Sequence, residues 1–254
     1  MIPSWKKLGE LLKTIEKGKY KENPKNLSKH EKYKTLASMT FEKATNPKYS
    51  WSQSFSILKD TWGHCFNSLK FHPNAPDVWE LFGDTSYERC EMVLALFAYD
   101  KALEQHSENE EKLRLKRAET TKIANLFVAV EKEQLPINVL FHLLICIGCG
   151  ANGKLNPYVD IKKYTVNSGA IKTKYTATTT VPLCDNCNTK PKSNARRNLK
   201  YGSNGVAVKV GKGGPLVYNL WKQYVILEKF KAGQIDDEIF NAIPQALKQP
   251  KYPF

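Results

Sequence analysis

Two pairs of cysteines carry the strongest chemical signal in this sequence. Cys146 and Cys149 are separated by two residues, Cys184 and Cys187 have the same spacing, and 34 residues lie between the two pairs. Four thiolates at about 2.3 Å satisfy the tetrahedral geometry and the soft ligands that Zn²⁺ prefers, and a site closed in this way is structural. The spacing therefore predicts one structural Zn²⁺ bound by Cys146, Cys149, Cys184 and Cys187. An iron–sulfur cluster and four reduced core cysteines are the alternatives.

The segment between the cysteine pairs predicts a β-hairpin that would position them. Residues 158–166 and 171–181 are rich in β-branched and aromatic residues, and Asn167-Ser-Gly169 between them is a turn signal. A hairpin alone is at best marginally stable in water. A metal ion that joins both of its ends would supply the missing free energy.

Basic residues are concentrated in the same region. The chain has 39 Lys and Arg against 25 Asp and Glu, and residues 151–212 hold 12 basic and only 2 acidic side chains. Residues 51–150 hold 10 basic and 14 acidic ones. Such a local excess favours contact with a polyanion, either DNA or RNA, over a general effect on solubility. The alternatives are a basic background composition and lysines that only protect strand edges from aggregation.

The candidate nucleic-acid contacts lie on the hairpin and after the second cysteine pair. They are Lys162, Lys163, Lys172, Lys174, Lys190, Lys192, Arg196, Arg197 and Lys200. Tyr158, Tyr164 and Tyr175 lie among them and are expected to add stacking on unpaired bases.

The remaining composition limits the class of protein. A hydrophobic content of 41% is too high for a disordered polymer. The longest apolar run, residues 137–147, is shorter than the roughly 17–25 residues that span a bilayer. The first residues contain no continuous apolar stretch of the kind found in signal peptides. We therefore expect a cytoplasmic, intracellular protein in a reducing compartment, with no membrane partner.

Apolar residues recur at helical spacing outside the cysteine region. The expected helices cover residues 4–17, 28–44 (inside a lysine-rich connector, 18–50), 55–69, 77–87, 89–104 and 108–132. Two more are expected from about Leu216 and Asp236. The predicted fold class is mainly α with a small β-hairpin zinc module, α+β overall.

One part of the helical region resembles a tetratricopeptide repeat. The matching positions are His72-Pro-Asn-Ala-Pro-Asp77, Trp79, Phe82, Gly83, Ala95, Tyr99 and Ala102. Together with a degraded repeat before it, the resemblance covers residues 45–105. It implies close crossing of two helices at the small residues, and a scaffold that binds a protein partner. An unrelated helical bundle is the alternative.

The second cysteine pair resembles the closing knuckle of zinc-stapled HNH endonucleases. The match consists of Val181-Pro-Leu-Cys184-Asp-Asn-Cys187-Asn188 and the strand around Asp160. The catalytic histidine of that family has no counterpart, since residues 143–254 contain no histidine. The resemblance therefore implies a treble-clef-like zinc module without nuclease activity.

We divide the sequence into four regions. They are a lysine-rich N-terminal helix and connector (1–50), a tetratricopeptide-like helical domain (51–140), a basic four-cysteine zinc module (141–212) and a C-terminal helical pair (213–254). The predicted function is a non-enzymatic adaptor that binds a protein partner through its helices and nucleic acid through its zinc module. An HNH-like nuclease and a protein-only scaffold with structural zinc are the alternatives.

Overall fold

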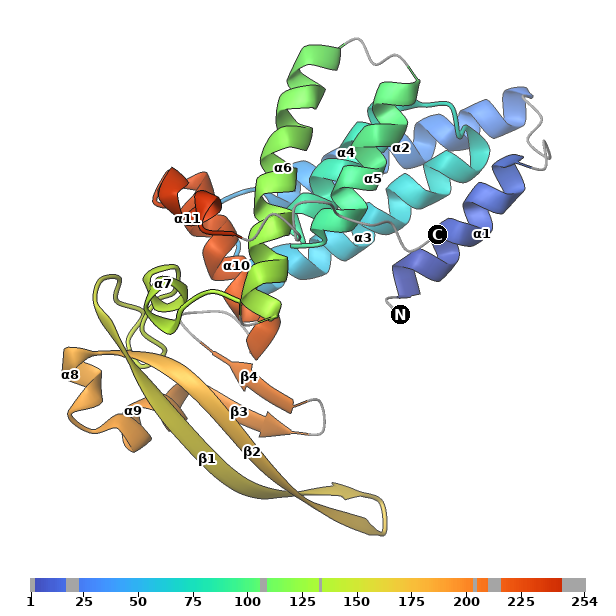
Figure 1. Ribbon diagram of the computed structural model, residues 1–254. Coiled ribbons are helices and arrows are strands. Elements are labelled where there is room, and N and C mark those ends of the chain that lie inside the picture. Colours follow the sequence, from blue (N-terminus) through green and yellow to red (C-terminus); the bar gives the residue numbers. More distant parts are fainter. Residues whose placement is uncertain are drawn as a thin grey trace. The chain divides into compact units, whose positions relative to one another are not determined.

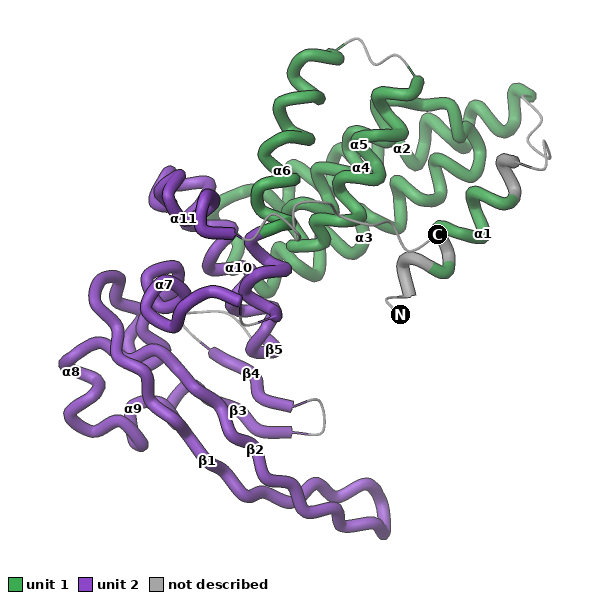
Figure 2. Tube along the Cα trace, in the orientation of Figure 1, with its two compact units in different colours: residues 1–125, 246–254 green, residues 126–245 purple. Residues whose placement is uncertain are grey.

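The computed structural model describes residues 3–16, 23–105, 109–132, 134–202, 205–209 and 216–243 (Figure 1). The chain divides into two compact units, residues 1–125 with 246–254 and residues 126–245 (Figure 2). The first unit is helical, and the second combines short helices with two small antiparallel sheets. The predicted fold class, mainly α and α+β overall, is confirmed. None of the helices in the described ranges is long and apolar enough to cross a membrane.

The first unit contains a series of helices joined by short connections. They are α1 (Pro3–Glu16), α2 (Pro24–Ala44), α3 (Trp51–Phe71), α4 (Pro76–Glu88), α5 (Met92–Glu104) and α6 (Glu110–Glu131), the last of which continues into the second unit.

Two of these helices begin earlier than their apolar periodicity predicted. Helix α2 starts at Pro24 rather than at residue 28, because the side chain of Asn23 accepts a hydrogen bond from the Asn26 N–H at 2.9 Å. Helix α3 starts at Trp51 rather than at residue 55, and the Ser50 N–H donates to Gln53 Oε1 at 2.9 Å. Capping residues therefore extend both helices by about a turn beyond their apolar stripes.

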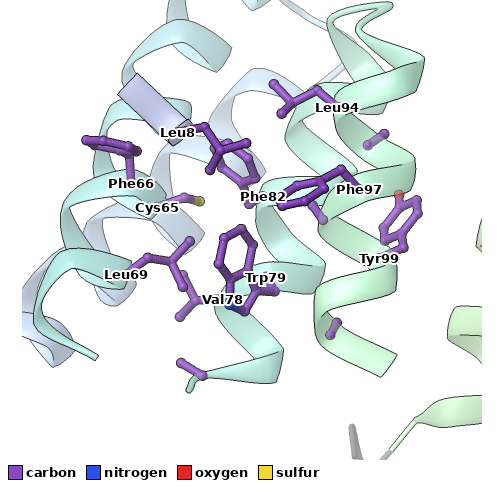
Figure 3. Close-up of a cluster of buried hydrophobic side chains, with 14 of the residues drawn as sticks. Leu8, Cys65, Phe66, Leu69, Val78, Trp79, Phe82, Leu94, Phe97 and Tyr99 are labelled. Carbon is purple, nitrogen blue, oxygen red and sulfur yellow. The ribbon is translucent and has the colours of Figure 1, made fainter. Parts of the chain in front are cut away.

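The core of the first unit is built around aromatic side chains of α4 and α5 (Figure 3). Trp79 lies edge-on to Phe82 and Phe97, with ring centroids 6.0 and 6.1 Å apart. The indole N–H of Trp79 donates to the carbonyl of Pro73 at 2.8 Å, so its one polar atom is satisfied although the side chain is buried. These contacts fix the connection before α4 against the helix that follows.

Helices α4 and α5 approach closely at Gly83, as the sequence predicted. A Cβ placed on Gly83 would lie 2.3 Å from the ring of Tyr99, so only glycine fits there. The Tyr99 hydroxyl donates to Asp84 at 2.7 Å, and Lys116 from α6 bonds the same carboxylate at 2.7 Å. Lys116 also bonds Glu80 at 2.8 Å. Helix α6 is thus tied to α4 by a half-buried ion-pair network.

The second unit contains the predicted hairpin. Strands β1 (Leu155–Ser168) and β2 (Ile171–Cys184) pair antiparallel from Leu155↔Cys184 to Ser168↔Ile171. A second, unpredicted sheet consists of three short strands, β3 (Leu199–Gly202), β4 (Gly205–Val208) and β5 (Leu216–Val217), in the order β3-β4-β5. The remaining elements are α7 (Ile137–His142), α8 (Asp185–Asn188), α9 (Pro191–Asn198), α10 (Tyr218–Lys231) and α11 (Asp237–Asn241).

The predicted C-terminal helical pair is present as α10 and α11, and α10 supports the hairpin. The hydroxyl of Tyr218 donates to the carbonyl of Thr180 on β2 at 2.8 Å. The amine of Lys229 donates to the carbonyls of His142 and Leu144 at 2.9 and 2.8 Å. Burial lowers the pKa of Lys229. Helix α10 therefore holds both β2 and the segment that leads into the first cysteine pair.

Candidate metal centre and basic surface

The four cysteines predicted as ligands lie together in the second unit. The sulfur atoms of Cys146, Cys149, Cys184 and Cys187 all lie within 4.8 Å of one another. Cys149 Sγ and Cys184 Sγ are 3.7 Å apart, and all four thiols are free. Ligands about 2.3 Å from a tetrahedral metal lie about 3.8 Å from each other, so the cluster has the size of a thiolate metal site. Within the described ranges, no other group of three or more potential ligands is placed in this way.

The first cysteine pair lies in a tight turn that is fixed by backbone hydrogen bonds. The Gly150 N–H donates to the carbonyl of Cys146 at 2.7 Å, and the Ile147 N–H donates to the carbonyl of Pro182 on β2 at 2.9 Å. A Cβ on Gly148 would lie 2.8 Å from the sulfur of Cys187 and 3.2 Å from its Cβ. Gly148 therefore allows the two cysteine pairs to approach each other.

The second pair joins the end of the hairpin to a helical turn. Cys184 is the last residue of β2, and Cys187 lies in α8 and is buried. The helical turn therefore begins directly after Leu155↔Cys184, the pair at the open end of the hairpin. The side chain of Asn156, next to Leu155 on β1, donates to Asp185 at 2.6 Å. Both strands of the hairpin thus help to position this cysteine pair.

The environments of the thiols differ. Burial acts to raise the pKa of Cys146, but backbone N–H groups of Cys184, Cys149 and Gly148 lower it to about 7. Burial, together with the neighbouring thiols, raises the pKa of Cys187 to about 12. Four thiolates crowded together repel one another, so their full ionisation requires a cation among them.

Helix α9 joins the two cysteine pairs through its side chains. Asn194 donates to the carbonyl of Cys187 at 2.8 Å, and Asn198 donates to the carbonyls of Ile147 and Gly148 at 2.7 and 3.0 Å. The guanidinium of Arg197 also donates to Gly148. These contacts orient the peptide units next to the thiols, as outer-shell groups do in metal sites. Neither asparagine was predicted. No local pattern links Asn198 to carbonyls 50 and 51 positions away, and Asn194 lies seven residues after Cys187 without a recognisable motif.

A buried carboxylate ties the hairpin to α9 and β3. Asp160 has no exposed surface, and Arg196 Nε lies 3.0 Å from its Oδ1. The guanidinium of Arg196 also donates to the carbonyl of Ile161 at 2.8 Å, and the Tyr201 hydroxyl donates to Asp160. Burial, followed by the hydrogen bond to Asp160, raises the pKa of Tyr201. Arg196 and Arg197, both predicted as nucleic-acid contacts, therefore also make contacts within the module, although Arg197 remains exposed.

The predicted lysines lie at the surface of the same unit. Lys162 is half-buried, and the exposed ones are Lys163, Lys172, Lys174, Lys190, Lys192 and Lys200. None of these seven makes an ion pair with a residue that the structure describes. A shallow hollow of about 570 Å³ at the start of α9 is lined by Lys190, Pro191, Lys192, Ser193 and Arg196. The surface around the second cysteine pair is thus basic and open.

Two of the tyrosines expected to stack on bases contact each other instead. The rings of Tyr164 and Tyr175 are stacked with centroids 5.5 Å apart, and the ring of Tyr201 lies 5.7 Å from that of Tyr164. The Tyr164 hydroxyl donates to the carbonyl of Gly202 at 3.2 Å. The ring of Tyr164 is thus half-buried between protein contacts, whereas Tyr175 remains exposed.

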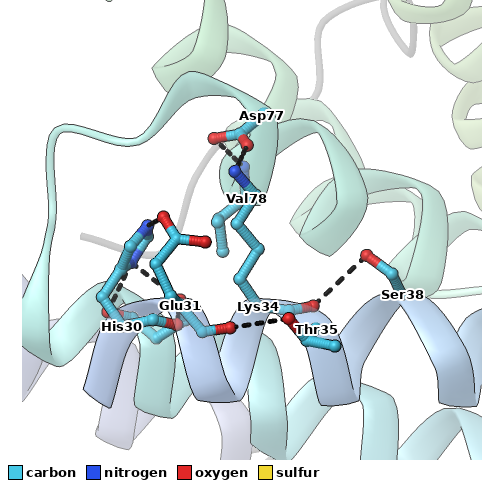
Figure 4. Close-up of polar contacts among 8 residues, drawn as sticks. His30, Glu31, Lys34, Thr35, Ser38, Asp77 and Val78 are labelled. Carbon is cyan, nitrogen blue, oxygen red and sulfur yellow. Dashed lines mark hydrogen bonds and ion pairs between the residues drawn. The ribbon is translucent and has the colours of Figure 1, made fainter. Parts of the chain in front are cut away.

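The first unit contains a histidine–serine pair that superficially resembles a nucleophile and its base, and Figure 4 shows its histidine, His30, beside Glu31 on α2. His30 Nδ1 lies 2.8 Å from Ser68 Oγ, and Glu31 lies 3.7 Å from the other ring nitrogen. Both His30 and Ser68 are buried, so a substrate has no access to them. Burial lowers the pKa of His30. The pair joins α2 to α3, and an ion pair between Lys34 and Asp77 at 2.6 Å similarly joins α2 to α4.

Comparison with protein-family models, curated proteins and solved structures finds no match to this chain.

Proposed function

We propose that the four-cysteine cluster binds one Zn²⁺ and that the metal stabilises the second unit. The donor set of four soft sulfurs suits zinc, and the closed set leaves no position for a substrate. When bound, the ion would neutralise thiolate charge and join the first cysteine turn to the end of the hairpin. The chain itself orients the ligands through the α9 asparagines and the backbone N–H groups around Cys146.

We propose that this zinc module binds nucleic acid. The observation that carries the proposal is the set of seven lysines on the hairpin and around α9, none of which is neutralised by an acidic residue in the described ranges. Of the two acidic residues between positions 151 and 212, Asp160 is buried against Arg196. Lysines on a rigid surface displace counterions from phosphates, which gives binding that weakens steeply with salt.

The helical unit is proposed to be the half that binds a protein partner. The supporting feature is the packing of α4 on α5 at Gly83, where the small residue and the surrounding aromatic residues have the roles that a tetratricopeptide repeat requires. Helices α2 and α3 lie before this pair and pack against each other through His30 and Ser68. The whole protein is then an adaptor between a protein and a nucleic acid.

We propose no catalytic role for the module. Asp160 occupies the strand position that corresponds to the HNH carboxylate, but it has no exposed surface and accepts hydrogen bonds from Arg196 and Tyr201. A carboxylate held in this way cannot reach a phosphodiester. Incubation of supercoiled plasmid with the protein and Mg²⁺ or Mn²⁺ is expected to give no nicking. Nicking that copurifies with the folded protein would show that the module is a nuclease.

Metal analysis combined with a binding titration tests the proposal. We expect one zinc per chain, and binding of generic DNA or RNA whose logarithmic affinity falls linearly with the logarithm of salt concentration. Replacing Lys190, Lys192 and Lys200 with glutamine should reduce the slope without changing the zinc content. Zinc with no nucleic-acid binding at low salt would leave a protein-only scaffold as the function.

A further inference from the structure

The turn end of the β1–β2 ribbon has a lysine-bearing face that the metal site does not use. In an antiparallel ribbon, residues that pair across the strands point to the same face, and alternate pairs share that face. Lys163 pairs with Thr176, Lys174 with Thr165, and Lys172 with Asn167. The three lysines therefore share one face, with a step of about 6.8 Å between successive pairs. We call Lys163, Lys172 and Lys174 the ribbon lysines.

The end of the ribbon projects beyond the rest of its unit. The last support is at Tyr164, whose ring and hydroxyl contact Tyr201 and Gly202 of β3. Residues 167–176 are all exposed, and the turn end extends past β3 and β4 in Figure 1. Four paired residues on each strand follow Tyr164, which gives a free length of about 13 Å. The free part is thus a narrow, two-stranded projection.

The charge of this projection is uniform. Residues 161–184 contain four lysines and no acidic residue. Most of its other exposed side chains are hydroxyl and amide groups, including Thr165, Asn167 and Ser168. Such side chains donate hydrogen bonds to phosphates and to base edges. Ile171 and Tyr175 are also exposed there, so the projection combines two apolar side chains with cationic and polar groups that suit a polyanion.

The shape of the projection matches the major groove of B-form DNA. That groove is about 12 Å wide and 8.5 Å deep, and it admits a two-stranded β-ribbon. A free length of about 13 Å is sufficient to reach its floor. The major groove of A-form RNA is too deep and narrow for side chains to read. A single strand would require stacking platforms, and Tyr164 and Tyr175 are stacked on each other.

We propose that the β1–β2 ribbon inserts its turn end into the major groove of duplex DNA, with the ribbon lysines on the phosphates that border the groove. This inference rests on the proposed nucleic-acid function and specifies its partner. The anchor formed by Asp160, Arg196 and Tyr201 holds the base of the ribbon, so that the projection enters the groove as a rigid element.

The test compares the full-length protein with two variants of equal charge. The first replaces Lys163, Lys172 and Lys174 with glutamine, and the control replaces the exposed lysines Lys32, Lys59 and Lys112 of the helical unit. Each variant is first checked to have the zinc content and the oligomeric state of the wild type. Three lost phosphate contacts should reduce the salt slope by about 2.7 and lower the affinity on the order of 10²-fold at 0.1 M salt. The control should bind like the wild type.

Substrate choice gives the second readout. We expect duplex DNA to bind more tightly than duplex RNA or a single strand of the same sequence. A DNA duplex whose major groove is filled by glucosylated hydroxymethylcytosine keeps its phosphate charge and should bind at least tenfold more weakly than the unmodified duplex.

The possible failures can be distinguished. If the wild type binds no nucleic acid at low salt, the proposed function fails. The groove proposal fails, while nucleic-acid binding stands, if the wild type binds single strands more tightly than duplex DNA or binds glucosylated and unmodified duplexes equally. The same conclusion follows if loss of the ribbon lysines leaves the DNA affinity unchanged. A glutamine variant that self-associates with unchanged DNA affinity would show that the ribbon lysines only protect the strand edges.

Discussion

Replacing Gly148 with alanine tests the metal-centre geometry most directly. The added methyl group would lie 2.8 Å from the sulfur of Cys187 and 3.2 Å from its Cβ. Neither neighbour can yield easily, because the carbonyl of Gly148 is held by Asn198 at 3.0 Å and that of Cys187 by Asn194 at 2.8 Å. The contact can be relieved only by moving one cysteine pair away from the other.

The expected cost follows from overpacking at a constrained site. Inserting a methyl group into well-packed structure typically costs about 1–3 kcal/mol. Here the displacement would also distort the sulfur tetrahedron, so the cost should appear in metal affinity. Since about 1.4 kcal/mol corresponds to a factor of ten, we expect zinc binding to weaken by about 5- to 150-fold.

Competition with a chromogenic chelator measures this effect, and Gly202→Ala is the matched control. Gly202 lies in the same unit and a Cβ there would meet nothing within 4 Å. Cobalt substitution adds a readout of ligand geometry, because thiolate-to-metal absorption reports tetrahedral sulfur coordination. If Gly148→Ala bound zinc as tightly as Gly202→Ala, the close approach of the two cysteine pairs would not be needed for the site, and the geometric argument would be refuted.

Three further changes test other parts of the structure. Arg196→Ala should destabilise the second unit by about 3–5 kcal/mol in denaturant unfolding, because it leaves the buried carboxylate of Asp160 without its cation, and Arg196→Lys should restore part of the loss. Gly83→Ala should destabilise the helical unit by about 1–3 kcal/mol, since its methyl would lie 2.3 Å from the α5 tyrosine ring, whereas Gly63→Ala, which meets nothing, should be neutral or stabilising. The free energy of unfolding should fall as pH drops below 6.5, because burial lowers the pKa of His30 and the unfolded chain therefore binds a proton that the folded chain does not. Measuring the stability of the wild type and of His30→Asn against pH tests this, and the variant should lose this fall.

The predictions that succeeded depend on short-range patterns. The two Cys-x-x-Cys pairs and the turn at Asn167-Ser-Gly169 are local signals, and the sulfur cluster and the hairpin are both present. The close approach at Gly83 was implied by the resemblance of residues 72–102 to a tetratricopeptide repeat, in which two adjacent helices cross at small residues. The turn and the helix pair each join neighbouring elements, and the hairpin then brings together the two cysteine pairs, which are 34 residues apart.

The contacts that the sequence did not predict depend on residues far apart in the chain. Arg196 and Arg197 have the composition of a phosphate-binding pair, yet one neutralises Asp160 on a distant strand and the other donates to Gly148. The second sheet was missed because β3, β4 and β5 are too short for a periodic signal. The distribution of charge along the sequence thus predicted a basic surface. It did not predict which basic side chains make contacts within the fold.

The different roles of the arginines and the lysines also connect the proposed zinc site with the proposed DNA binding. The arginines hold α9 against the hairpin and the first cysteine turn, while the lysines remain at the surface. A guanidinium suits the first role because its planar donors fix several acceptors at once, and a mobile ammonium suits a phosphate backbone of variable geometry. Loss of the metal should therefore weaken DNA binding even though no predicted contact residue is a ligand, since the ribbon would lose the anchored base that directs its lysines. Chelation that removed zinc without changing DNA affinity would contradict this coupling and would assign the two roles to independent parts of the module.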